Sequence, residues 1–258
     1  MFSRMIYNFL LLSLFTASTV WAGDATKLHF IGFSEDGRYL AFQQYGTADG
    51  SGIPFSTLYF VDVKNNYYPK KQIETLDTTG EKSEGKILQQ NFDAGAGILR
   101  ELGIIAGNQG QKVISHLFSD VGVELKTVRF AVGMPLAGLY YRTYALTLEE
   151  MKSNKKCLPS QRSRTYTLNL RERDGKKDCF GVGQSRMFTL YLHNENENAS
   201  KILQKDRSLP FSRGCPLGYR IQDVYIYQEK YIAVFLNMFT PGFEGQDMRY
   251  LVVTGLLN

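Results

Sequence analysis

The chain has 258 residues, of which 43% are hydrophobic and 13% aromatic, and its formal net charge is +5 at pH 7. This content provides a sizeable core, and the length fits one large β domain or two small ones. The 30 Lys and Arg residues are scattered, whereas a nucleic-acid footprint needs a contiguous basic face. The composition therefore predicts a folded protein and excludes nucleic acid as an expected partner.

The first 22 residues have the pattern of a secretory signal peptide. Arg4 precedes an apolar run over residues 9–15, and the segment closes on Val20-Trp21-Ala22, which resembles a cleavage site. The run is too short for a transmembrane helix, which needs about 20 apolar residues. We expect cleavage after Ala22, leaving a single mainly β domain over residues 23–258, periplasmic or secreted, without a transmembrane anchor.

Apolar and polar residues alternate through much of the remaining chain, as is typical of β-strands. The alternation predicts strands at His29–Phe33, Tyr39–Gln44, Thr57–Val63, Lys112–Phe118, Glu124–Val132, Leu139–Leu148, Thr165–Leu170 and Met187–Leu192. The first two are joined by a tight turn at Glu35-Asp36-Gly37, because glycine tolerates a positive φ. The sequence therefore predicts a mainly β protein.

One segment changes to helical spacing. The apolar residues of Glu84–Leu102 recur at intervals that suit a helix, and Gly103 is a plausible stop. Gly95 and Gly97 weaken the middle of this helix. We expect it to be the one helical insertion in the β fold.

The two ends of the mature chain share a pattern. Tyr39–Val63 and Tyr231–Gly255 have the same length, and each combines a Tyr-aliphatic-Ala strand, a Gly-containing acidic loop and an apolar strand. Each also follows a strand and a short turn, so we expect two similar antiparallel meanders like the blades of a β-propeller. Four comparable repeats are not found in the sequence. A β-sandwich is therefore the alternative topology.

Three cysteines remain, Cys157, Cys179 and Cys215. An odd count in an oxidising compartment predicts one disulfide and one spare thiol. Cys179 lies in the loop of the predicted hairpin, whereas Cys157 precedes this hairpin and Cys215 follows it, both at its other end. This reasoning favours Cys157–Cys215, with Cys179–Cys215 as the alternative.

Several stretches resemble known families. Residues 33–42, "FSEDGRYLAF", are similar to the strand-turn-strand text of TolB-like and WD40-like propeller blades. The mature chain as a whole resembles the predicted secreted bacterial proteins known as domain of unknown function 2259, through residues 30–63 and the stretches "ILRELGI", "LPFSRGCPLGYRI" and "FTPGFEGQDMRYLVVTG". This resemblance implies a largely β fold exported by a Gram-negative-type bacterium, and it implies no activity.

Motifs for catalysis or for a metal are weak. His29, His116 and His193 stand far apart and outside any metal-ligand spacing. Ser185 lacks the second glycine of a G-x-S-x-G elbow. We therefore expect no metal, no cofactor and no catalytic residue.

The acidic loops of the two meanders carry the candidate binding site. Asp49 in the first loop and Glu244 and Asp247 in the second occupy equivalent positions, so packing of the meanders side by side would bring them to one rim. Phe55 and Phe243 would line a shallow groove beside them or close the end of the core. Asp and Gly are also ordinary turn residues that cap local amides.

Two functions follow from these features. The sequence favours a non-catalytic periplasmic or secreted module that binds an envelope protein, peptide or glycan. The alternative is a carboxylate-dependent hydrolase acting on envelope glycan, with two of the rim carboxyls as acid and base. That mechanism requires these carboxyls to lie about 5–10 Å apart across an open cleft.

Overall fold

A computed structural model describes residues 23–117, 125–133, 164–243 and 245–258. The predicted signal peptide and the predicted strand Leu139–Leu148 lie outside these ranges. The described elements are β1 (Lys27–Phe33), β2 (Tyr39–Thr47), β3 (Pro54–Asp62), β4 (Ile73–Leu76), α2 (Glu84–Glu101), β5 (Gln111–Ser115), β6 (Thr127–Val132), β7 (Arg164–Asp178), β8 (Gln184–Asn194), β9 (Ala199–Lys205), the 3-10 helix η1 (Phe211–Arg213), β10 (Gly218–Tyr227), β11 (Tyr231–Pro241) and β12 (Gln246–Leu256).

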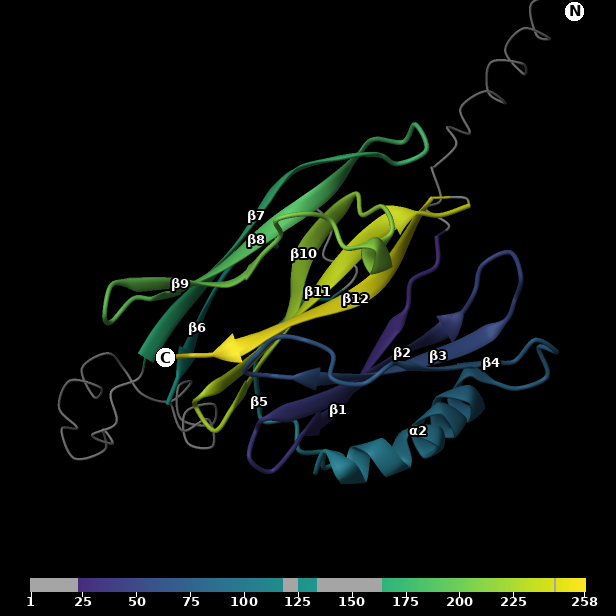
Figure 1. Cartoon of the computed structure of the whole chain (residues 1–258), viewed down its shortest axis with the longest axis horizontal. Coiled ribbons are helices and arrows are strands. Elements are labelled where there is room, and N and C mark those ends of the chain that lie inside the picture. Colours follow the sequence, from purple (N-terminus) through teal and green to yellow (C-terminus); the bar gives the residue numbers. More distant parts are fainter. Residues whose placement is uncertain (1–22, 118–124, 134–163, 244) are drawn as a thin grey trace, which may run out of the picture.

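The described strands form three antiparallel sheets of four strands each (Figure 1). The first sheet, β1-β2-β3-β4, and the third, β6-β7-β8-β9, are meanders in which every strand pairs with its neighbour in sequence. The second sheet, β12-β11-β10-β5, adds β5 to a meander of the last three strands. The predicted mainly β fold with a helical insertion is confirmed.

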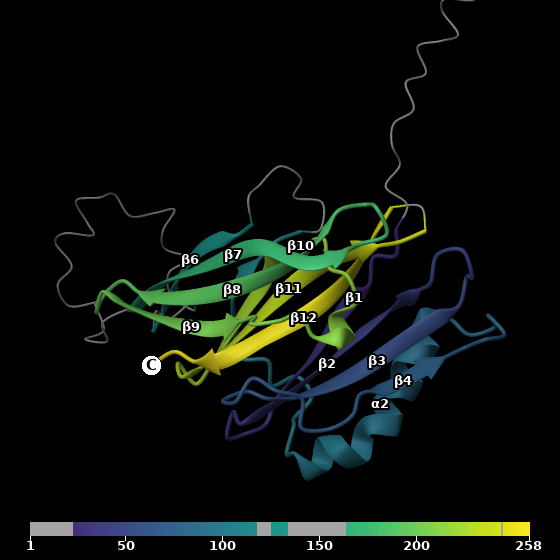
Figure 2. The same ribbon diagram turned by 45° about the horizontal axis from the view of Figure 1, so that its top comes forward.

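The second sheet is buried on both faces between the other two. Successive side chains of a strand point to opposite faces, and β11 shows this division along its length. The residues that join the core of the third sheet are Ile232, Val234 and Leu236, and those that join the core of the first sheet are Ala233 and Phe235. This double burial explains why β11 is apolar almost throughout. Figure 2 shows the three sheets stacked, with α2 beyond the first.

Helix α2 covers the outer face of the first sheet, where Leu99 packs in one cluster with Leu58. The helix begins after Ser83, whose Oγ accepts a hydrogen bond from Lys86 N at 3.4 Å. It ends at Glu101, and the chain turns away at Gly103 with a φ of 64°. The predicted helix and its glycine stop are therefore confirmed.

The two similar segments at the ends of the chain fold as the expected meanders. Tyr39 lies opposite Asp62 in the first, and Tyr231 lies opposite Leu256 in the second. The two sheets share one cluster of buried residues, whose aromatic members include Phe30, Phe33, Phe42, Tyr225 and Phe235. The described residues form a stack of sheets without a closed ring, as in a β-sandwich extended by a third layer. The propeller comparison stays a prediction.

Three strands differ most from the sequence analysis. β4 and β9 are not predicted, because both are edge strands with many polar and exposed residues. β7 extends beyond the predicted end at Leu170 to Asp178, because its charged second half still pairs with β8 as far as Gln184. The β7–β8 hairpin consequently reaches well beyond the apolar core.

Candidate functional site

Three hairpin turns, one from each sheet, lie at the same end of the stack in both views (Figures 1 and 2). They are residues 48–53 between β2 and β3, residues 179–183 between β7 and β8, and the turn between β11 and β12, described at 242–243 and 245. We call these three turns the loop end. Because turns carry binding residues more often than strands do, the loop end is the candidate binding surface.

Asp24, in the N-terminal segment, links two of these turns. Its carbonyl accepts hydrogen bonds from Met248 N at 2.7 Å and from Arg249 Nη1 at 3.0 Å. Its amide donates to Asp247 Oδ1 at 3.0 Å, and its carboxylate accepts a hydrogen bond from Asp49 N. The carboxylate also lies 3.3 Å from Arg249 Nη2. The segment thus connects the β2–β3 turn to the start of β12.

Two of the predicted site residues therefore come to one rim. Both carboxylates have local partners: that of Asp49 accepts a hydrogen bond from Gly50 N at 2.9 Å, and that of Asp247 accepts the Asp24 amide and lies 3.9 Å from Arg249 Nη2. These are the capping bonds that turn residues usually make. The described rim carboxylates therefore organise the turns in which they lie.

The predicted aromatic residues separate into two environments. Phe55 on β3 lies beside the rim, with the Arg249 guanidinium carbon 5.5 Å from its ring centre. Phe243 lies in the β11–β12 turn and is 92% exposed. Glu244 lies outside the described residues. The sequence analysis missed Asp24 and Arg249, because they are 225 positions apart and belong to no local motif.

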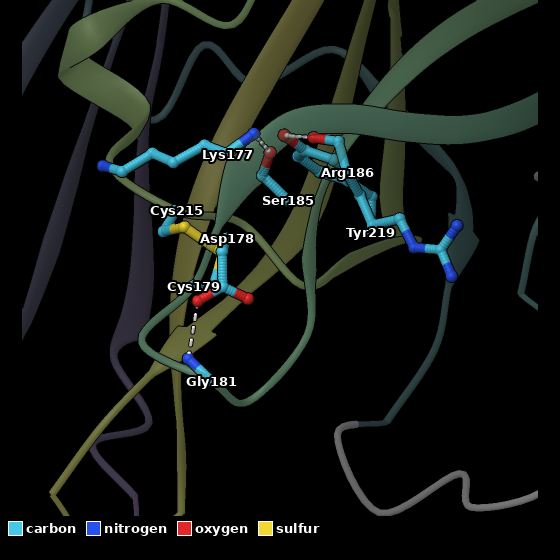
Figure 3. The surroundings of a disulfide bond; sticks show 8 residues. All are labelled: Lys177, Asp178, Cys179, Gly181, Ser185, Arg186, Cys215 and Tyr219. Atoms are coloured by element: carbon cyan, nitrogen blue, oxygen red, sulfur yellow. Dashed lines mark hydrogen bonds between the residues drawn. A yellow bond between two sulfur atoms is a disulfide. The ribbon is translucent and has the colours of Figure 1, made fainter.

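A disulfide joins Cys179 in the β7–β8 turn to Cys215, with a Cα–Cα distance of 5.6 Å (Figure 3). The favoured pairing Cys157–Cys215 is therefore wrong, and the alternative is the one observed. The error comes from the unpredicted strand β9, which runs back along β8 and returns the chain to the β7–β8 turn before Cys215. Cys157 lies outside the described residues.

Two exposed rings flank this disulfide. Phe180 follows Cys179 and is 82% exposed, and Phe211 in η1 is 100% exposed. The β7–β8 turn is held by hydrogen bonds from Cys179 N to Gly183 O at 2.8 Å and from Gly181 N to Asp178 Oδ2 at 2.8 Å. The rings therefore project from loops that are fixed by a covalent bond and by hydrogen bonds.

A pocket of about 490 Å³ lies between η1 and the β7–β8 hairpin. Its charged lining residues are Arg173, Asp174, Lys176, Lys177 and Arg207. The one acid among them is paired with Arg186, and Arg173 Nη2 donates to Asp206 O at 2.6 Å. The lining is therefore positively charged overall.

Buried Asp206 fixes η1 beside this pocket. One of its carboxylate oxygens accepts hydrogen bonds from Arg213 Nη1 at 2.5 Å and from Phe188 N at 3.1 Å. The Arg213 guanidinium carbon also lies 4.9 Å from the centre of the Phe188 ring. Because charge-assisted bonds of this kind are the strong ones, we expect the wall of the pocket to be rigid.

A family model described as "Predicted secreted protein (DUF2259)" matches residues 41–255. The chain belongs to this family. The comparisons with curated proteins and with solved structures found no match.

The described part of this DUF2259 protein shows neither a metal-binding cluster nor a membrane-spanning helix. It contains no group of three or more His, Cys, Asp or Glu side chains placed to hold a metal ion. No helix within the described ranges is both long enough and apolar enough to cross a membrane.

Proposed function

We propose that this protein is a non-catalytic binding module of the periplasm or the cell exterior of a Gram-negative-type bacterium, and that its loop end contacts the partner. An envelope protein, peptide or glycan is the proposed partner. The family description supports the export of the chain. The binding role is supported by features of the loop end.

The distribution of exposed apolar side chains is the main support for this role. The three most exposed large apolar side chains of the described residues are Phe211, Phe243 and Phe180, at 100%, 92% and 82%. Phe180 and Phe243 belong to the loop end, and η1 is joined to it by the disulfide. Exposed apolar groups that gather in one region mark interaction sites.

The rim residues Asp49 and Asp247 form the polar part of the proposed surface, and the Phe55 ring lies beside them, with the Arg249 guanidinium carbon 5.5 Å from its centre. The bonds of Asp49 and Asp247 to backbone amides favour a binding role over the hydrolase alternative. A general acid and base need carboxyls that are directed at a substrate across a cleft. Here both carboxylates are used to hold the N-terminal segment and the turns.

Capture by the exported chain, Gly23–Asn258, tests this function. The immobilised protein is mixed with purified envelope glycan fragments and with an envelope protein extract, and each captured component must bind again in purified form. We expect Phe180→Ser/Phe243→Ser to lose capture and Ile105→Ser to retain it. Ile105 is half-exposed, and its amide donates to Phe33 O, at the end of the first sheet where β1 and β2 are joined by their turn. Equal capture by both variants, or release of sugar from the glycan fragments, would contradict the proposal.

A further inference from the structure

The loops joined by the Cys179–Cys215 disulfide combine exposed rings with cations. Phe180 and Phe211 project into solvent. Lys176, Lys177 and Arg207 line the adjoining pocket, and none of these three has an ion-pair partner among the residues that the structure describes. We call these five residues the disulfide-linked patch.

The acidic residues near the patch are already engaged. Asp174 is paired with Arg186. Asp178 accepts the Gly181 amide at 2.8 Å, which holds the β7–β8 turn closed. The positive charge of the patch is therefore only partly offset locally, and it attracts anionic groups.

Phe180 is an outlier in its backbone as well as in its exposure. Its φ of 58° lies in the left-handed region, where a bulky side chain is unusual and costs free energy. Glycine or asparagine would fit that position with less strain. A phenylalanine that is both strained and exposed at this position is explained if its ring contacts a binding partner.

We infer that the disulfide-linked patch binds the surface of a membrane that contains anionic phospholipid. This inference rests on the proposed binding role of the loop end, and it identifies an anionic membrane as the partner of the disulfide-linked patch. Exposed phenylalanine rings bury at the boundary between the headgroups and the acyl chains of a bilayer, and lysine or arginine near an anionic leaflet is attracted to it. Their long side chains keep the charges near the phosphates while the rings reach deeper.

The arrangement of the two rings favours a bilayer over an acidic protein. Phe180 and Phe211 stand on separate loops, and Lys176, Lys177 and Arg207 line the pocket together with Phe211. A protein interface has a continuous core from which charged residues are depleted. The pocket of about 490 Å³ is in the size range of small-ligand sites, and its cations can donate to a headgroup phosphate.

Vesicle flotation of the exported chain tests the inference. Vesicles of phosphatidylcholine alone are compared with vesicles that also contain phosphatidylglycerol. We expect binding only to the anionic vesicles, weakening as salt is added. Phe211→Ala should lower the affinity about tenfold, as expected for a ring withdrawn from an apolar phase. Lys176→Glu/Lys177→Glu should lower it by more than about tenfold.

Matched variants control for net charge and folding. Lys71→Glu/Lys86→Glu changes the charge equally at exposed positions outside the patch, and Leu76→Ala truncates an exposed apolar residue on β4. Both should bind like the parent chain, and every variant should keep its melting temperature. The lipid inference is overturned if neutral and anionic vesicles bind equally, if the control reversal weakens binding as much as the patch reversal, or if no vesicle binds.

The two proposals fail in distinguishable ways. If the chain binds no vesicles but captures a purified glycan or protein through Phe180 and Phe243, the proposed function stands and the lipid inference is wrong. If it binds neither vesicles nor a glycan or protein, both proposals are wrong.

Discussion

Gly95 of helix α2 lies directly against Leu58 of strand β3. A Cβ atom at position 95 would overlap Leu58 Cδ2 and would lie 3.5 Å from Phe60 Cζ and 3.6 Å from Ile73 Cδ1. A glycine that appears from sequence to weaken the helix is therefore what allows the helix to approach the sheet.

Replacing Gly95 by alanine should destabilise the protein. Alanine favours a helix interior over glycine by about 1 kcal/mol, but overpacking of this contact should cost more, about 1–3 kcal/mol. Gly97 is the matched control, because a Cβ there meets nothing within 4 Å, and Gly97→Ala should stabilise by about 0.5–1 kcal/mol. Urea unfolding measures both, and stabilisation of equal size in the two variants would show that the close approach has no cost.

A buried amide holds the same helix to the sheet. Asn91 is fully buried. Its Oδ1 accepts hydrogen bonds from Gln43 Nε2 at 2.8 Å and from Ser56 Oγ at 3.0 Å, and its Nδ2 donates to Ile73 O at 2.9 Å and to Thr75 Oγ1 at 3.1 Å. Asn91→Ala should destabilise by about 2–3 kcal/mol, because it leaves buried partners without bonds.

Gln89 provides the control for this amide. Its Nε2 donates to Asp93 Oδ1 at 2.8 Å on the exposed side of the same helix. Pairs of this spacing contribute about 0.2–0.5 kcal/mol, so Gln89→Ala should have a small effect in the same urea titration. If Asn91→Ala proves equally mild, the buried bonds do not fasten the helix.

Parts of the fold with a strong local pattern could be predicted from sequence. The β1–β2 hairpin has its turn residues in place, where Asp36 Oδ1 accepts hydrogen bonds from Ser34 Oγ at 2.7 Å and from Arg38 N at 3.0 Å. Strand β11 is apolar on both faces, which marks a buried strand. The helix shows its period and its stop at Gly103. These features depend on residues close together in the chain.

The candidate site could be predicted only in part, because its links are not local. The loops of Asp49 and Asp247 come together as expected from the similar meanders, but the connection runs through Asp24 and Arg249. The charged edge strand β9 lacks an apolar pattern and is not predicted. Without it, the sequence analysis places Cys215 at the end of the β7–β8 hairpin opposite to Cys179. Sequence periodicity reveals a strand's buried face and says little about its partner.

Removing the disulfide should destabilise the protein through the unfolded chain. Cys179 and Cys215 are 36 positions apart, and closing a loop of this length is worth about 3–4 kcal/mol in the chain-entropy model. Cys179→Ser should approach that loss in urea unfolding, while Cys157→Ser should leave the bond intact. Peptide mapping without reductant should recover Cys179 linked to Cys215 from the parent chain and from Cys157→Ser. A linked Cys157–Cys215 peptide would contradict the observed pairing.

Alkaline pH should destabilise the protein through its buried tyrosines. Burial raises the pKa of Tyr219 to about 12, and burial also raises the pKa values of Tyr59, Tyr225 and Tyr250. The folded state favours the neutral phenol, so this contribution to stability is fully present below the unfolded pKa of about 10. It is lost as the pH rises through the folded value.

Tyr219→Phe isolates one of these groups. The Tyr219 hydroxyl donates to Arg186 O at 3.3 Å, a long bond whose loss near neutral pH should cost no more than about 1 kcal/mol. Above pH 10 the parent chain should lose about 1–2 kcal/mol more stability than the variant, because only the parent must keep this phenol protonated. Urea midpoints measured across that range, together with tyrosinate absorbance, provide the comparison. Parallel curves for the two proteins would mean that Tyr219 ionises as easily when folded as when unfolded.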